Sequence, residues 1–180
     1  MPEKLDFITP KVMRVLEFFF MYPMEEFYER EIMRKTKISK GSANKILRLL
    51  TKFDFLIKEK RGRMVFYKLN VKNPVVKQFK ILFNVWQVRK LVYEISQFTK
   101  KIILFGSCAE GSDVKESDID LFILTTKKEL VRESISKFNR KSERRIVPII
   151  VDANEFVKLK KEDKPLYERI EKGIILWEKE

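Results

Sequence analysis

The spacing of apolar side chains predicts helices in the first third of the chain. Residues 9–22 begin with Thr9 and Pro10, which suit a helix start because threonine accepts an N-cap hydrogen bond and proline fits the first turn. We expect a second helix over about 27–36 and a third over about 39–53. The apolar positions of the first and third segments recur at helical spacing: Val12, Val15, Leu16, Phe19, Ala43, Ile46, Leu47, Leu50 and Phe53.

The period of the pattern changes after residue 56. Residues 57–60 and 64–69 flank Arg61-Gly62-Arg63, which predicts a β-hairpin with a basic, glycine-containing tip. A long helix is then expected from Asn73-Pro74 to about residue 97. Its apolar residues exceed one narrow stripe, so we expect it to be covered on several sides, with Trp86 in a core. It either packs two domains together or forms the seam of a homodimer.

The second half of the chain alternates short apolar runs with amphipathic segments. This pattern indicates a small mixed α/β domain, and we expect an α+β protein overall. The expected strands are 102–105, 118–124 and 145–151, and the expected helices are 127–141, a segment that begins at Asp152, and 165–172, before a closing apolar stretch at 174–177.

Two carboxylates mark the second of these strands as a candidate site. Side chains alternate along a strand, so Asp118 and Asp120 are expected to point the same way. Paired carboxylates repel each other and are tolerated beside a divalent cation. Upstream, Gly106-Ser107 follows an apolar strand, and glycine allows backbone to approach a phosphate closely. The alternative is a surface turn between two strands with an incidental acidic pair.

Gly106-Ser107, ten intervening residues and then Asp118-Ile119-Asp120 resemble the signature of the DNA polymerase β-like nucleotidyltransferases. Ala109 and Gly111 fit the minimal form of the loop, and the similarity covers about residues 100–178. It implies that Gly106, Ser107 and Ser117 bind a nucleotide triphosphate. It also implies that Asp118 and Asp120 are catalytic and hold Mg²⁺ or Mn²⁺.

One residue of that pattern is missing. Members that transfer nucleotides usually carry a third carboxylate on the next strand, but residues 146–151 contain no acid. Pro148 stands about where the acid is expected, and a strand proline indicates an edge or a bulge. Asp152 is expected to cap the following helix instead. We therefore predict nucleotide binding with weak or absent transferase activity.

The positive charge is concentrated in the first half of the chain. Residues 1–100 hold 22 Lys and Arg against 10 Asp and Glu, whereas residues 101–180 hold 17 against 16. A net charge of +12 in one half is the electrostatic signature of a module that binds a polyanion. Two domains with different partners are the simplest explanation.

The stretch REIMRKTKISKGSANKILRLL, followed by FYKLN, resembles the winged helix-turn-helix domain of DNA-binding regulators over residues 10–70. Phe55 departs from the pattern, which commonly has glycine there. The resemblance implies that the third helix enters the major groove of double-stranded DNA and that the hairpin reaches the flanking backbone. The alternative is a winged helix used for protein contacts. The implied DNA-binding residues are Lys40, Ser42, Asn44, Lys45, Arg48, Arg61 and Arg63.

Composition limits the remaining possibilities. The chain has no histidine, which excludes histidine-based catalysis, and its one cysteine, Cys108, is expected to be a packing residue rather than a nucleophile. No apolar run reaches about 18 residues, and the first residues lack a signal-peptide core, so we expect a cytoplasmic protein.

We therefore expect a winged helix at 1–72, a connecting helix at 73–98 and a nucleotidyltransferase-like domain at 99–180. Three functions stay open. The protein transfers a nucleoside monophosphate to an unknown acceptor, or it is a DNA-binding regulator whose second domain senses a nucleotide or recruits a partner. By resemblance alone, it is an antitoxin-like protein that binds its own operator and modifies a partner protein.

Overall fold

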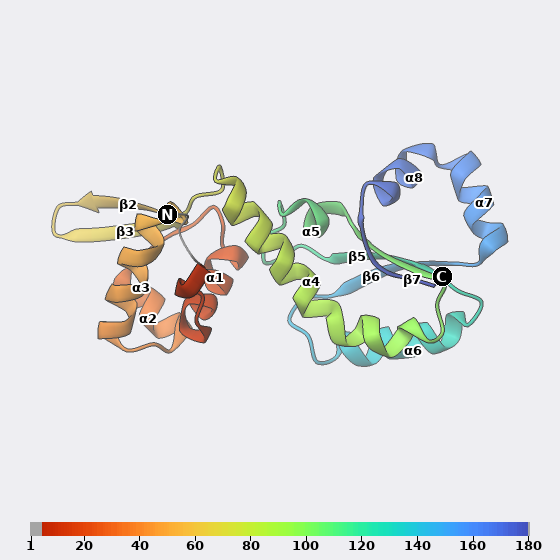
Figure 1. The fold of residues 1–180 in the computed structure, drawn as a ribbon, viewed down its shortest axis with the longest axis horizontal. Helices are drawn as coiled ribbons and strands as arrows, with labels where there is room; N and C mark the ends of the chain where they lie inside the picture. The colour runs from red at the N-terminus through yellow and green to blue at the C-terminus, as the bar shows by residue number, and fades with distance from the viewer. Residues whose placement is uncertain (1–4, 180) are drawn as a thin grey trace. The chain divides into compact units, whose positions relative to one another are not determined.

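The computed structural model describes residues 5–179 of the chain, which forms two compact units. Unit 1 is Met1–Lys80 and unit 2 is Ile81–Glu180, so the division falls inside helix α4, Pro74–Ser96 (Figure 1). Within residues 5–179, no helix has the length and apolar character needed to cross a membrane.

Unit 1 is a winged helix. A short 3₁₀ turn, η1 (Leu5–Phe7), precedes three α-helices, and the helices pack beside a three-stranded antiparallel sheet of order β1-β3-β2 (Figure 1). The helices and the hairpin that the sequence predicts are confirmed. Their bounds are α1 Pro10–Met21, α2 Glu29–Thr36, α3 Lys40–Lys52, β1 Glu26–Tyr28, β2 Leu56–Arg61 and β3 Met64–Leu69.

Local chemistry fixes the start of α1 and the turn after α3. The hydroxyl of Thr9 accepts from the Val12 N–H at 3.3 Å, which satisfies one orphan donor of the first turn. After α3 the backbone takes a left-handed turn at Asp54, whose φ is 56°. Phe55 therefore needs no glycine-like conformation, and its ring is buried against Phe7 and Phe79.

The predicted start of the second helix is wrong. Phe27 and Tyr28 belong to β1, where they pair with Tyr67 and Phe66 of β3. The helix starts only at Glu29, after the N–H of Tyr28 donates to the Glu31 carboxylate at 3.2 Å. The pairing partner lies about 40 residues away in the sequence, so the local pattern gave no signal for this strand.

Unit 2 is built on a four-stranded mixed sheet of order β6-β5-β4-β7, in which only β5 and β6 are parallel. The closing apolar stretch is β7, an edge strand, and β6 is the other edge, as Pro148 predicts. The bounds are β4 Lys101–Phe105, α5 Gly106–Glu110, β5 Ile119–Leu124, α6 Lys128–Asn139, β6 Ile146–Val151, α7 Ala153–Glu162, α8 Lys164–Glu171 and β7 Ile174–Glu178.

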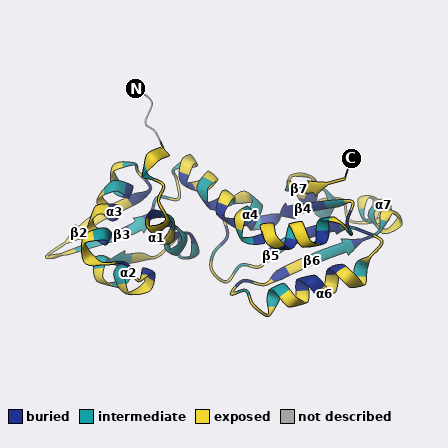
Figure 2. Ribbon diagram, turned by 60° about the horizontal axis from the view of Figure 1, so that its bottom comes forward, coloured by how far each residue is buried: buried dark blue, intermediate teal, exposed yellow. Residues whose placement is uncertain are grey.

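Alternation of side chains along the strands creates two cores in unit 2. Ile119, Leu121 and Ile123 of β5 face α4 and α6, while Phe122 faces α7 and α8 with Ile103 and Val151. Figure 1 shows the two helix pairs on opposite sides of the sheet, and Figure 2 shows the central strands buried between them. Asp120 has the parity of Phe122, so it belongs to the α7 and α8 face.

Trp86 is not in a core, contrary to the expectation for α4. Its side chain is 57% exposed, and Leu82 and Tyr93 are also exposed on the outer surface of the helix. The guanidinium of Arg89 stacks over the indole ring of Trp86 at 3.6 Å, which shields part of this apolar surface. The sequence shows an apolar surplus on α4, but it does not show that an arginine covers it.

Gly173, between α8 and β7, gives a test of how closely this turn packs against β4 and the end of α8. A Cβ atom there would lie 2.5 Å from both Ile103 Cγ2 and the Leu104 carbonyl oxygen, and 2.9 Å from the Ile170 carbonyl oxygen. Gly173→Ala is therefore expected to destabilise unit 2 by about 1–3 kcal/mol, the usual cost of overpacking. Both tryptophans lie in unit 2, so the midpoint of their fluorescence change in urea measures the effect.

Gly41→Ala is the matched control, because nothing lies within 4 Å of a Cβ atom at that helical position. It should leave the tryptophan transition unchanged. A Gly173→Ala protein with the wild-type midpoint would contradict the close approach of α8 and β4.

Candidate active site

The candidate site begins where β4 ends. Gly106 has a φ of +68°, and a Cβ atom at this residue would lie 2.4 Å from Oδ2 of Asp120. The antiparallel register of β4 and β5 sets this approach, because it pairs Phe105 with Asp120. Glycine is therefore required here for two reasons: its left-handed backbone and the carboxylate that occupies the side-chain position.

Asp120 shares its surroundings with a second carboxylate. Asp118 is exposed one residue before β5, and Asp120 is half-buried within the strand. Burial raises the pKa of Asp120, the positive charge of Arg169 opposes that rise, and the charge of Asp118 adds to it. The two aspartates are therefore close enough to repel each other, as expected for neighbours on one face.

A buried polar cluster holds the loop between α5 and β5. Within this Arg144 network, the guanidinium of Arg144 pairs with Asp113 at 3.1 Å, and both side chains are only 2% exposed. Arg144 also donates to the Asn84 side-chain oxygen, the Ser117 carbonyl oxygen and Cys108 Sγ at 3.1, 3.2 and 2.9 Å. Asn84 completes the ring by donating to Asp113 and to the Cys108 carbonyl oxygen.

The network fixes the segment that presents the aspartates. It joins α4, α5, the loop at Asp113 and the residues before β6, so both ends of the connection from Gly106 to Asp118 are tied to buried partners. Sequence reasoning missed it. The partners are 24 to 60 residues apart, and a single Arg or Asp in a loop gives no sign of being buried.

Cys108 is a packing residue of this network. Its thiol is buried and lies 3.3 Å from the Asp118 carbonyl oxygen, to which it donates. Burial is the main cause that raises the pKa of Cys108 to about 11, with Arg144 opposing the shift. The group stays a protonated thiol at neutral pH, so it is a poor nucleophile.

The two serines of the predicted site have different surroundings. Ser107 is half-buried in the first turn of α5, and its carbonyl oxygen accepts from the Ser112 N–H at 3.0 Å. The hydroxyl of Ser117 accepts from the Val114 N–H at 2.9 Å and so closes the turn that leads to Asp118. Ser117 has a structural role in addition to the nucleotide contact that the sequence predicts.

The strand beside Asp120 carries no acid. The parallel register pairs Asp120 with Val147 and Leu121 with Pro148, so the residue next to Asp120 is the valine, one position before the proline singled out from the sequence. Val147 is 39% exposed. Asp152 caps α7, as predicted, by accepting from the Asn154 and Glu155 N–H groups, and it pairs with Lys128 at 3.0 Å.

The donor set at this site suits one cation that is shared with a ligand. Within residues 5–179, no group of three or more Asp, Glu or Cys side chains forms a metal cluster. Asp118 and Asp120 supply hard carboxylate oxygens, and Mg²⁺ is commonly bound by one or two carboxylates plus substrate phosphates. The two aspartates therefore fit Mg²⁺ or Mn²⁺, which would offset their mutual repulsion and the negative charge of phosphates.

The residues predicted to bind DNA lie along α3 and the hairpin of unit 1. Lys40, Asn44, Lys45 and Arg48 are exposed along α3. Ser42 is half-buried, and its hydroxyl accepts from the Ser39 hydroxyl at 3.1 Å.

The two arginines of the hairpin differ in their partners. Arg61 pairs with Glu26 at 2.9 Å and Glu59 at 2.8 Å, and its guanidinium lies over the Phe66 ring. Arg63 makes no ion pair among the residues that the structure describes. The charge of Arg61 is thus largely neutralised within the protein.

Most of unit 2 matches a known protein family. The family model for the polymerase beta nucleotidyltransferase domain matches residues 90–180, a segment that contains Gly106, Asp118 and Asp120. The chain belongs to the polymerase beta nucleotidyltransferase family. This confirms the family that the spacing of the Gly-Ser and Asp-Ile-Asp motifs indicates. No curated protein matches the chain.

Solved structures give weaker likenesses. A protein from Sulfolobus solfataricus described as a nucleotidyltransferase is 17% identical over 57% of this chain and 87% of its own, with a TM-score of 0.38. A mutant of the toxin–antitoxin pair MntA-HpeT is 21% identical over 53% and 74%, also at 0.38. The archaeal chromatin protein TrmBL2 is 14% identical over 94% and 72%, at 0.33. These scores carry no functional argument.

The Arg144 network makes a prediction about stability. Arg144→Ala removes a buried cation beside the Asp113 carboxylate, and the loss of one partner of a buried ion pair typically costs about 3–5 kcal/mol. The midpoint of urea unfolding, followed by tryptophan fluorescence, should fall accordingly. Arg145→Ala is the matched control, because Arg145 is the next residue and is exposed. Equal midpoints for the two variants would show that the buried pair does not stabilise unit 2.

Proposed function

We propose that unit 2 binds a nucleoside triphosphate together with one divalent cation. Asp118 and Asp120 hold the cation, and Gly106, Ser107 and Ser117 contact the phosphates. The observation that carries this proposal is the approach of the Asp120 carboxylate to the Gly106 backbone, where a Cβ atom would lie 2.4 Å from the carboxylate oxygen. The carboxylate that would hold the cation thus lies directly beside the Gly106 backbone. Because Gly106 has no side chain, a phosphate can approach this backbone closely.

The electrostatic surroundings of Asp120 support a cation at this position. Its pKa is raised chiefly by burial and further by Asp118, so the ionised carboxylate lacks full stabilisation from the protein alone. A divalent cation between the aspartates would favour the ionised form. Beside the phosphates, the same cation would offset the charge of the triphosphate.

The same geometry limits what the site does after binding. The third carboxylate of active transferases would deprotonate or orient the attacking hydroxyl, a contribution of about 10²–10⁴-fold in rate. Val147 lies beside Asp120 where β6 could supply such a group. We therefore infer binding of the triphosphate and cation with weak or absent transfer to an acceptor.

We propose further that unit 1 binds double-stranded DNA. It has the winged-helix arrangement, and residues 1–80 hold 19 Lys and Arg against 9 Asp and Glu. Its exposed α3 side chains include Lys40, Lys45 and Arg48, which would contact bases or phosphates from the major groove.

A second candidate function follows from Val147. A regulator of transcription whose nucleotidyltransferase domain senses a nucleotide, or recruits a partner protein, needs no acid on β6. An antitoxin-like protein that modifies its partner does need a competent transfer site. Labelling of an acceptor therefore separates these two possibilities.

Replacement of both aspartates tests the nucleotide site. In calorimetric titration with Mg²⁺ present, ATP should bind the Asp118→Asn/Asp120→Asn protein at least roughly tenfold more weakly, a loss of about 1.4 kcal/mol. Metal-dependent binding should also weaken as the pH falls. Because the pKa of Asp120 is raised, protons compete with the cation from a higher pH than at an ordinary aspartate.

The stability of the Asp120→Asn protein shows whether a loss of ATP binding comes from unfolding. A raised carboxyl pKa means that stability from Asp120 decreases as pH rises through the interval between its unfolded and folded pKa values. At pH 7 without metal, Asp120→Asn should therefore be at least as stable as the wild type.

Equal ATP affinity in the double variant would refute the site. Strong labelling of an acceptor from cell extract, lost in Asp118→Asn, would instead show a competent transferase.

DNA binding by unit 1 should depend steeply on salt. The logarithm of the binding constant is expected to fall by about 0.9 per log unit of salt for each phosphate neutralised. Lys45→Ala/Arg48→Ala should lower both affinity and slope in fluorescence anisotropy with a labelled duplex. Lys158→Ala/Lys161→Ala on α7 removes the same charge from exposed positions of unit 2. If both double variants bind alike, α3 does not contact the DNA.

A further inference from the structure

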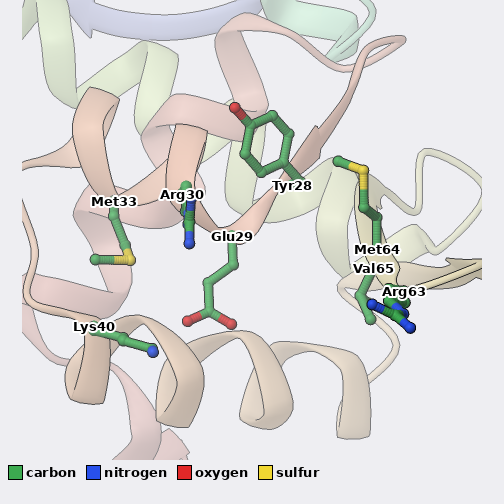
Figure 3. A pocket seen from close by; sticks show the side chains of 8 residues that line it. All are labelled: Tyr28, Glu29, Arg30, Met33, Lys40, Arg63, Met64 and Val65. Atoms are coloured by element: carbon green, nitrogen blue, oxygen red, sulfur yellow. The ribbon is translucent and has the colours of Figure 1, made fainter.

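A cleft of about 660 Å³ opens in unit 1 between the helices and the hairpin. This wing cleft is bounded by the start of α2, the first residue of α3, and the turn and start of β3 (Figure 3). None of the nucleotide-site residues contributes to it. Its lining residues are Tyr28, Glu29, Arg30, Met33, Lys40, Arg63, Met64 and Val65.

The charged groups of the wing cleft are available to a ligand. Arg30, Lys40 and Arg63 are exposed, and none of them forms an ion pair within residues 5–179. Arg61 is different, because Glu26 and Glu59 already bind its guanidinium. Three cations with no ion-pair partner in the described part of the chain thus line the cleft, and one of them, Arg30, is outside the predicted DNA-binding set.

We propose that the wing cleft holds one sugar–phosphate strand of the DNA, with Arg30, Lys40 and Arg63 on its phosphates and with no phosphate contact from Arg61. This inference rests on the proposed binding of DNA by unit 1. It adds Arg30 to the interface and removes Arg61 from it, although the sequence predicts the reverse.

The distribution of the cations favours a strand over a small anion. Figure 3 shows Lys40 and Arg63 on opposite sides of the cleft, with Arg30 on a different element from either. Cations that serve one small anion converge on a point, whereas a strand presents one phosphate after another. Met64 and Val65 give the cleft an apolar wall, which suits the sugars between the phosphates.

Glu29 opposes the strand from within the cleft. Its carboxylate lies among the cleft side chains (Figure 3), and it is the first residue of α2, where the helix dipole favours a negative charge. Burial raises the pKa of Tyr67, and the negative charge of Glu29 raises it further. A carboxylate beside a phosphate strand is repulsive, so Glu29 limits the affinity for DNA.

Salt titration of the full chain with a labelled duplex tests the cleft. Arg30→Ala should reduce the slope of log affinity against log salt by about 0.9, close to a tenfold loss of affinity at about 0.1 M salt. Arg61→Ala is the matched control and should keep the wild-type slope. Glu29→Gln should bind several-fold more tightly. Arg30→Lys keeps the charge and should restore the slope, which a purely structural role for Arg30 would not require.

The outcomes separate this inference from the function on which it rests. A wild-type protein that binds no duplex at low salt overturns both. Binding that is salt-dependent, but unchanged by Arg30→Ala, overturns the wing cleft alone. Equal losses in Arg30→Ala and Arg61→Ala, or weaker binding by Glu29→Gln, do so as well.

Discussion

Arg144 brings a full positive charge into the interior of unit 2, and the candidate site depends on how that charge is neutralised. Asp113 and Asn84 lie beside the guanidinium, and the carbonyl oxygen of Ser117 accepts a hydrogen bond from it. Because an unpaired buried charge is costly, these partners have little freedom to move. The loop between α5 and β5 is thereby held on both sides, and the aspartates follow it directly into β5. The electrostatics of a buried arginine thus determines where the carboxylates lie.

Strand geometry provides the second constraint. Alternation along β5 sends Leu121 to one core and Phe122 to the other, so Asp120 lies at the edge of the face that α7 and α8 cover. Its pKa is raised because the same strand that positions it also removes it from water. Register with β6 then decides that an apolar side chain, Val147, is its neighbour. Binding of a cation therefore depends on Asp120 in β5, whereas transfer would also require an acid on β6, where this chain has Val147.

Much of this was predictable from sequence because it depends on local pattern. The helix start at Thr9-Pro10, the hairpin and the motif that contains Gly106 and Asp120 are all short-range signals. The failures involve distant partners. β1 exists only through pairing with β3, and the Arg144 network joins residues up to 60 positions apart. Trp86 is a local exception, because the side chain that shields its exposed ring, Arg89, lies three positions further along the same helix. The charge of Arg61 looked available until Glu26 was brought beside it by the fold.

Cys108 has a consequence of another kind. It is the only cysteine of the chain, its thiol is buried, and Arg144 donates to its sulfur. A thiol reagent can reach it only when this part of unit 2 opens, so the rate of modification in native conditions reports how often the loop beside the aspartates is released. The protein therefore contains its own probe of local opening, and ligands that close the site should slow that reaction.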